Sequence, residues 1–166
     1  MLAAYNEPIH YQDSNSVWQD IDNTLTIQNP TASVDSQLLE NKANKTKKSF
    51  SAKMKAKAIS LKTGNYTISW GIDGADDANS NIISDQENSE NESHNDKFLK
   101  LKKINNEVVY RDALPDTDIQ YLVSSTSVKE DIILKSAAAK RTFTETYQIG
   151  SLVAKQIDSK KNIYFS

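Results

Sequence analysis

Apolar and polar residues alternate with a period of two in three separate stretches of the chain, residues 50–58, 66–72 and 142–149. This is the pattern of a β-strand that buries one face and exposes the other. A helix would spread the lysines of the first stretch, Lys53, Lys55 and Lys57, around its circumference, whereas a strand directs all of them to solvent. The alternation therefore predicts three strands.

Clusters of turn-forming residues separate further pairs of apolar runs and predict β-hairpins. The paired runs are residues 9–11 with 17–19, 119–123 with 128–134, and 152–157 with 163–165. The helix candidates, residues 34–40 and 136–141, are each barely two turns long. The expected fold is therefore all-β, either an antiparallel β-sandwich or a twisted assembly of several hairpins.

Composition limits the size of the core and the classes of partner. The chain has 166 residues, of which 37% are hydrophobic and 25% are charged, so we expect one domain with some stretches outside its core. A net charge of −2 gives no bulk attraction to nucleic acid or to anionic lipid. No apolar run approaches the roughly 18 residues of a membrane-spanning helix. The absence of cysteine excludes disulfides, thiolate zinc sites and cysteine nucleophiles.

Two blocks of like charge follow one another. Every charged residue between positions 42 and 62 is a lysine, and every charged residue between 73 and 96 is acidic. The lysine block fits either a patch for teichoic acid, glycan phosphate or nucleic acid, or the solvated face of a strand, and the alternation favours the strand face. The acidic block holds little that could be buried, so we expect residues 73–96 to form a long, mobile surface loop.

The residues that usually carry catalysis are scarce. The histidines are His10, on an expected strand, and His94, in the acidic block, so no helical histidine pair for a metal is available. The oxygen-rich cluster 73–81 does not match a calcium-binding loop. Asp116 and Asp118 could form a carboxylate pair, but a turn after proline explains them more simply. We therefore expect no enzyme activity, no catalytic residues, no cofactor and no metal site.

The tryptophans have two interpretations. Trp18 and Trp70 could stack on sugar rings, as in carbohydrate-binding modules, or fill the core. Because both lie in alternating runs, the sequence favours the core. If instead they are exposed, they would join Lys53, Lys55 and Lys57 in a polymer-binding site.

Several phrases of the sequence resemble a module of large secreted Gram-positive proteins. The phrases include YNEPIHY, WQDIDNTL, YTISW, LPDTDIQY and VKEDIIL, at residues 5–11, 18–25, 66–70, 114–121 and 128–134. The module resembled is the N-terminal one of wall-associated and RHS (YD)-repeat proteins, many of which carry DNRLRE domains. The resemblance covers nearly the whole chain, with residues 73–96 least similar. It implies a secreted or cell-wall-associated protein, with this module ahead of the repeat region.

The function expected from these observations is a non-catalytic structural or interaction module that packs against downstream regions of the same polypeptide. The alternative is a module that binds a glycan or a cell-wall polymer, and exposure of Trp18 and Trp70 would favour it. We expect residues 1–166 to be a single all-β module cut from a longer protein, with neither a nucleic-acid partner nor a membrane span. Because an unpaired strand edge can add another strand, dimerisation through exposed edges is a further expectation.

Overall fold

The computed structural model confirms the all-β prediction. It describes residues 6–33, 36–55, 57–75, 78, 80–82, 106–156 and 163–166, and these form fourteen β-strands and no α-helix. The ladders between neighbouring strands are antiparallel.

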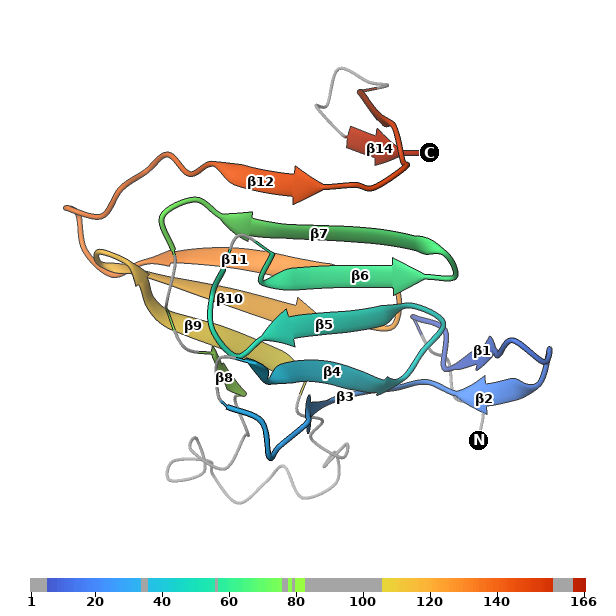
Figure 1. Ribbon diagram of the computed structural model, residues 1–166. Coiled ribbons are helices and arrows are strands. Elements are labelled where there is room, and N and C mark those ends of the chain that lie inside the picture. The colour runs from blue at the N-terminus through green and yellow to red at the C-terminus, as the bar shows by residue number, and fades with distance from the viewer. Residues whose placement is uncertain are drawn as a thin grey trace.

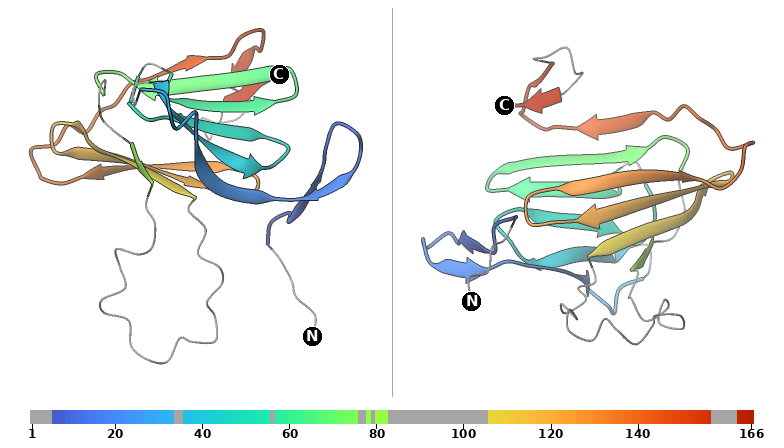
Figure 2. Two further views of the ribbon diagram at one scale, coloured as in Figure 1. Left: turned by 60° about the horizontal axis from the view of Figure 1, so that its bottom comes forward. Right: turned by 180° about the vertical axis from the view of Figure 1, so that it is seen from behind.

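Two sheets face each other in the body of the molecule (Figures 1 and 2). The strands of the large sheet are β3 Asp22–Gln28, β4 Leu38–Ala43, β5 Lys47–Ser51, β6 Ile59–Thr63, β7 Tyr66–Ile72 and β12 Glu145–Gln148. Those of the small sheet are β8 Ser80–Ile82, β9 Glu107–Leu114, β10 Thr117–Val123 and β11 Val128–Leu134. The large sheet has the order β12-β7-β6-β5-β4-β3, and the small sheet the order β11-β10-β9-β8. Strand β12 therefore joins the sheet of its distant neighbour β7 instead of following β11.

Two hairpins extend from this sandwich. One consists of β1 His10–Gln12 and β2 Trp18–Asp20, and the other of β13 Ala154–Gln156 and β14 Ile163–Phe165. Figure 1 shows the first hairpin beyond the β3 side of the large sheet and the second beyond β12. The strand pairs predicted on either side of residues 13–16, 124–127 and 158–161 are therefore confirmed, and the last of these three turns lies outside the described residues.

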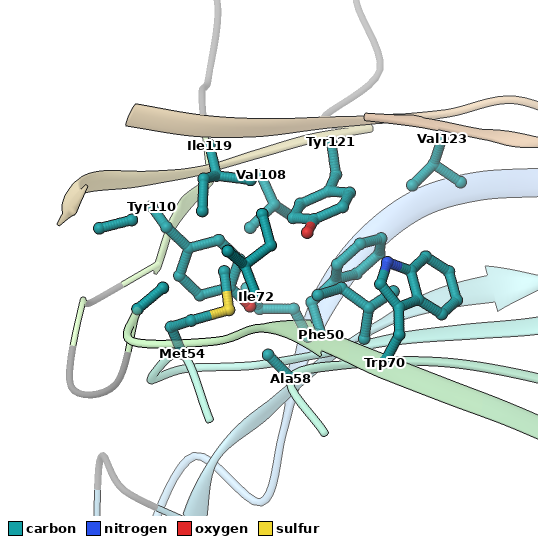
Figure 3. Close-up of a cluster of buried hydrophobic side chains, with 14 of the residues drawn as sticks. Phe50, Met54, Ala58, Trp70, Ile72, Val108, Tyr110, Ile119, Tyr121 and Val123 are labelled. Atoms are coloured by element: carbon teal, nitrogen blue, oxygen red, sulfur yellow. The ribbon is translucent and has the colours of Figure 1, made fainter. Parts of the chain in front are cut away.

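The core lies between the sheets and is rich in aromatic side chains. Figure 3 shows Tyr110 and Tyr121 of the small sheet reaching toward Phe50 and Trp70 of the large sheet. The ring centroids of Phe50 and Tyr121 are 5.6 Å apart, and those of Tyr110 and Tyr121 are 6.1 Å apart in an edge-to-face arrangement. The Tyr110 hydroxyl donates a hydrogen bond of 2.6 Å to the carbonyl oxygen of Ser51. Aromatic contact and this hydrogen bond therefore join the sheets.

The single strand predicted over residues 50–58 is wrong. Strand β5 ends at Ser51, and β6 begins at Ile59 after a loop in which Ala58 N–H donates to the carbonyl oxygen of Lys55. Phe50, Met54 and Ala58 are nevertheless buried, as the alternation predicts. The apolar side chains that anchor this loop on the core have the same spacing as those of a strand. A period of two alone therefore does not distinguish a strand from such a loop.

Other strand predictions are confirmed or corrected at their ends. The stretch 66–72 is strand β7, whereas 142–149 is a strand only over β12. Residues 38–40, part of a weak helix candidate, belong to strand β4. Most of the predicted acidic loop 73–96 lies outside the described residues, and residues 80–82 within it form strand β8.

Candidate binding groove

A concave groove lies where the β1–β2 hairpin meets the turns β4–β5 and β10–β11. Its volume is about 460 Å³, within the usual range for small-molecule sites. The lining residues are Pro8, His10, Tyr11, Gln12, Trp18, Ile21, Asn44, Lys45, Thr46, Ser125 and Thr126. They come from three segments that are far apart in the sequence, and most of them offer aromatic or hydrogen-bonding groups.

The hairpin that forms one wall is shaped by Asp13. Its Oδ1 accepts hydrogen bonds from the backbone N–H groups of Asn15 (2.9 Å) and Val17 (3.0 Å), and its Oδ2 accepts one from Gln19 (3.0 Å). Such side-chain-to-backbone bonds are the reason Asp is favoured in turns. The bond from Val17, followed by that from Gln19, lowers the pKa of Asp13. Asp13 therefore fixes the turn that leads into β2.

Trp18 is 67% exposed, so the prediction that it lies in the core is wrong. All three residues of β2 are exposed, because within the described residues no further strand packs over the two-stranded hairpin. The exposed ring lines the groove. An indole held in this way on a strand offers an apolar face to a ligand at little conformational cost.

The opposite wall is fixed by a lysine that the structure buries. Lys48, on β5, is only 2% exposed, and its Nζ donates hydrogen bonds to the carbonyl oxygens of Ser124 and, at 3.3 Å, Ser125. Glu7 Oε2 accepts a hydrogen bond of 2.8 Å from Ser125 N–H. Burial lowers the pKa of Lys48, and the charge of Glu7 opposes that shift. The β10–β11 turn is therefore held on the large sheet by a buried cation.

Two buried asparagines extend this network to the β4–β5 turn. Asn44 Nδ2 donates to the carbonyl oxygen of Ser125 (2.9 Å) and to Asn23 Oδ1 (3.0 Å). Because the Asn44 amide is satisfied within the protein and the Thr46 hydroxyl is hydrogen-bonded to that of Thr63 (2.7 Å), the side chain left for a ligand in this part of the groove is that of Lys45. The network thus positions the groove wall.

The structure does not bring the predicted polymer-binding residues together. Trp18 lines the groove, but Trp70 is only 8% exposed and lies in the core, as the sequence favoured. Lys53, Lys55 and Lys57 belong to the β5–β6 connection and do not line the groove. The predicted solvated strand face is therefore replaced by a loop. The lysine block contributes Lys45 to the groove instead.

Sequence reasoning missed Lys48, although a signal for its burial was present. Lys48 precedes Phe50 by two residues, so both side chains point to the same, inner face of β5. The alternation can therefore be extended backward from Phe50, and it then predicts an inward-facing lysine.

Asp116 and Asp118 form a structural brace at the end of the small sheet. Asp118 Oδ1 accepts hydrogen bonds from Asp112 N–H (2.7 Å) and from the ammonium group of Lys135 (2.9 Å). Asp116 Oδ2 accepts one from Ser136 (2.8 Å). Burial raises the pKa of Asp118, but the bonds from Asp112 and Lys135 together outweigh it, and the pKa is lowered. This arrangement supports the turn interpretation of the two aspartates.

No group of three or more His, Asp or Glu side chains that could hold a metal occurs in the part of the chain that the structure describes. The predicted cluster 73–81 lies partly outside that part, so its cation binding stays untested. None of the described elements is a helix long and apolar enough to cross a membrane.

The fold and the groove define an antiparallel β-sandwich with a ligand-sized surface depression at one end. Comparison with protein-family models, with curated proteins and with solved structures finds no match for this chain.

Proposed function

We propose that this chain is a non-catalytic binding module of an exported, cell-wall-associated protein of the RHS (YD)-repeat type. Its ligand is a glycan or wall polymer, bound in the groove around Trp18. The observation that carries the proposal is the position of Trp18, which is 67% exposed and lines a groove of about 460 Å³. Large apolar side chains in such a setting often mark binding sites.

The chemistry of the groove suits a sugar. The C–H face of a pyranose ring packs on an indole, and Trp18 and Tyr11 provide aromatic surface in the groove. Sugar hydroxyls require donors and acceptors around the aromatic platform, and Gln12 and Thr126 provide both. Lys45 adds a positive charge, which favours a glycan that carries phosphate or carboxylate groups.

A second function, packing against downstream regions of the same polypeptide, is favoured by a different surface. The β13–β14 hairpin exposes large apolar side chains: Val153 is 56% exposed, Ile163 is 60% exposed and Tyr164 is 45% exposed. Apolar residues gathered on a small hairpin are typical of a surface that is covered by a partner. The two functions use different parts of the molecule and can be tested separately.

The test of the glycan proposal is binding to an array of bacterial wall glycans, followed by calorimetry with any ligand found. Trp18→Ala should weaken binding about tenfold, because stacking of about 0.5–1.5 kcal/mol and the buried area of the ring are both lost. Tyr66→Ala is the matched control, because Tyr66 is 59% exposed but does not line the groove. Absence of any glycan ligand, or equal binding by Trp18→Ala, would refute the proposal.

The second function is tested by capture of the downstream polypeptide by this chain. Ile163→Asp should abolish capture, whereas Trp18→Ala should leave it unchanged. Capture that survives Ile163→Asp would count against the hairpin as the contact surface.

A further inference from the structure

Two carboxyl groups from different sheets meet at the edge of the sandwich. Glu130, on β11 of the small sheet, is half-buried on the strand's inner side, together with Val128 and Ile132. Glu145, on β12 of the large sheet, is brought beside it by Trp70 and Tyr147, whose stacked rings bond to Glu130 and to Glu145 respectively. Strands β11 and β12 each form the edge of their sheet, so this contact joins the two sheets along one side.

Neutral aromatic donors surround the pair. Trp70 Nε1–H, from β7, donates a hydrogen bond of 3.3 Å to Glu130 Oε2. The Tyr147 hydroxyl, from β12, donates to Glu145 Oε2. The Trp70 and Tyr147 rings stack with centroids 5.8 Å apart and an interplanar angle of 19°. The two stacked rings therefore contact both carboxyl groups, Trp70 that of Glu130 and Tyr147 that of Glu145.

Tyr121, the cross-strand neighbour of Glu130 on β10, completes the environment. Its hydroxyl is fully buried and makes no hydrogen bond of good geometry within the described structure, although it lies near enough to Glu130 to lower the pKa of that carboxyl. Burial and the charge of Glu130 raise the pKa of Tyr121 far above its usual value. Tyr121 is thus a neutral donor and supplies no positive charge.

Among the described residues, the groups with the largest effect on the Glu130 carboxyl are uncharged or acidic. They are Tyr121 on β10, Glu145 on β12 and Trp70 on β7, with Tyr147 beside Glu145. Burial, reinforced by the hydrogen bond and the charge of Glu145, raises the pKa of Glu130 to about 7. The charge of a neighbouring carboxylate disfavours ionisation, so the Glu130 carboxyl keeps its proton until the pH is near neutral.

We propose that Glu130 and Glu145 form a proton-dependent contact that fastens strand β12 to the small sheet. While Glu130 is protonated, a hydrogen bond from its carboxyl group to Glu145 closes this edge of the sandwich. When both groups are ionised, their repulsion loosens β12 from its neighbours.

The contacts of strand β12 limit its release to β12 itself and the neighbouring β13–β14 hairpin. Strand β12 is paired with β7 over the four residues Glu145–Gln148. Tyr147 also contacts Phe165 of β14, with ring centroids 6.2 Å apart. Release of β12 would therefore also free the β13–β14 hairpin and change the presentation of its apolar residues.

Hydrogen exchange of the β12 and β7 backbone amides, corrected for the intrinsic pH dependence, tests the proposal. The β12 amides should exchange at least about tenfold faster at pH 8.5 than at pH 5.5, because the pKa of Glu130 rises by more than one unit on folding and each unit of linkage is a factor of ten. Emission from Trp70, measured in a Trp18→Phe background because the chain has 2 tryptophans, should change with a midpoint near 7.

Substitutions test whether the pH dependence arises from the Glu130–Glu145 contact. Glu130→Gln should keep β12 protected at both pH values, and Glu145→Gln should do the same if the first variant does not fold. Asp131→Asn is the matched control on the same strand, because Asp131 pairs with Lys129 at 2.8 Å, and it should retain the pH dependence. Equal protection of wild-type β12 at both pH values, or pH dependence that persists in Glu130→Gln, would overturn the proposal.

Discussion

Lys48 and Ser125 connect the two sheets at the groove, with the ammonium nitrogen of the first 3.3 Å from the carbonyl oxygen of the second. Burial of the lysine ammonium group costs free energy, and its hydrogen bonds to the turn carbonyl oxygens offset that cost. Removal of the ammonium group would leave those buried oxygens without a donor. The position of the β10–β11 turn, and with it one wall of the groove, therefore depends on this residue.

Substitution of the buried lysine tests that dependence. Lys48→Met should lower the free energy of unfolding by about 1–3 kcal/mol, because buried carbonyl oxygens lose their donor while the methionine fills most of the volume. Lys62→Met is the control, since Lys62 is exposed on β6 and a surface change is expected to stay within about 0.5 kcal/mol. Denaturant unfolding of both variants gives the comparison, and equal stabilities would show that the contact contributes nothing.

The Asp118 brace predicts an acid-dependent loss of stability. The folded pKa of Asp118 is lowered from 3.8, so its contribution is present above about 3.8 and is lost as the pH falls through the folded value. Asp118→Asn should cost about 1–3 kcal/mol at pH 7, because the Lys135 ammonium and Asp112 N–H lose a charged acceptor. The cost should diminish in acid.

A suitable comparison is Asp20→Asn, whose native side chain is 88% exposed. Thermal melts between pH 2 and pH 7 should show little change for this variant. A cost for Asp118→Asn that stays constant down to pH 2 would contradict the assignment.

Glu130 predicts the opposite pH dependence. Its folded pKa of about 7 lies above the unfolded value of 4.5, so its contribution is fully present below about 4.5 and is lost as the pH rises through about 7. Wild-type protein should therefore lose part of its stability between pH 5 and pH 8, and Glu130→Gln should lose less. Urea midpoints across this range measure the difference, and parallel curves for the two proteins would disprove the prediction.

The tryptophans provide a direct check of burial. Acrylamide should quench Trp18 strongly and Trp70 weakly, since they are 67% and 8% exposed. Trp18→Phe should therefore remove most of the quenchable emission, whereas Trp70→Phe should leave it. Similar quenching constants for the two variants would show that the exposure assigned to one of the two tryptophans is wrong.

Alternation predicted much of the fold because it reports which side chains meet the core. It located β7 and marked Phe50, Met54 and Ala58 as buried, whereas clusters of turn residues located the β10–β11 pair and the other two hairpins. It misplaced the chain after Ser51, since a loop anchored by Met54 mimics a strand. Strands β3 and β4 were missed because their inner positions include the buried polar residues Asn23 and Asn41.

The groove was less predictable than the fold. Trp18 was chosen as a candidate, but its exposure depends on the absence, among the described residues, of a further strand over β1 and β2. Lys45, Thr46 and Ser125 are ordinary surface residues in sequence terms, and only the packing of the sheets brings them to one place. A groove built from three segments that are distant in the sequence leaves no pattern in any one of them.

Because its walls come from residues 8–21, 44–46 and 125–126, the groove exists only when both sheets are assembled. Any compound that occupies it binds the native state alone, so it must raise the melting temperature in proportion to the logarithm of its concentration. A thermal-shift screen of wall-derived oligosaccharides would therefore detect ligands without a prior assay. Peptides with the sequence of the β1–β2 hairpin should fail to compete with the protein for such a ligand, even if they fold.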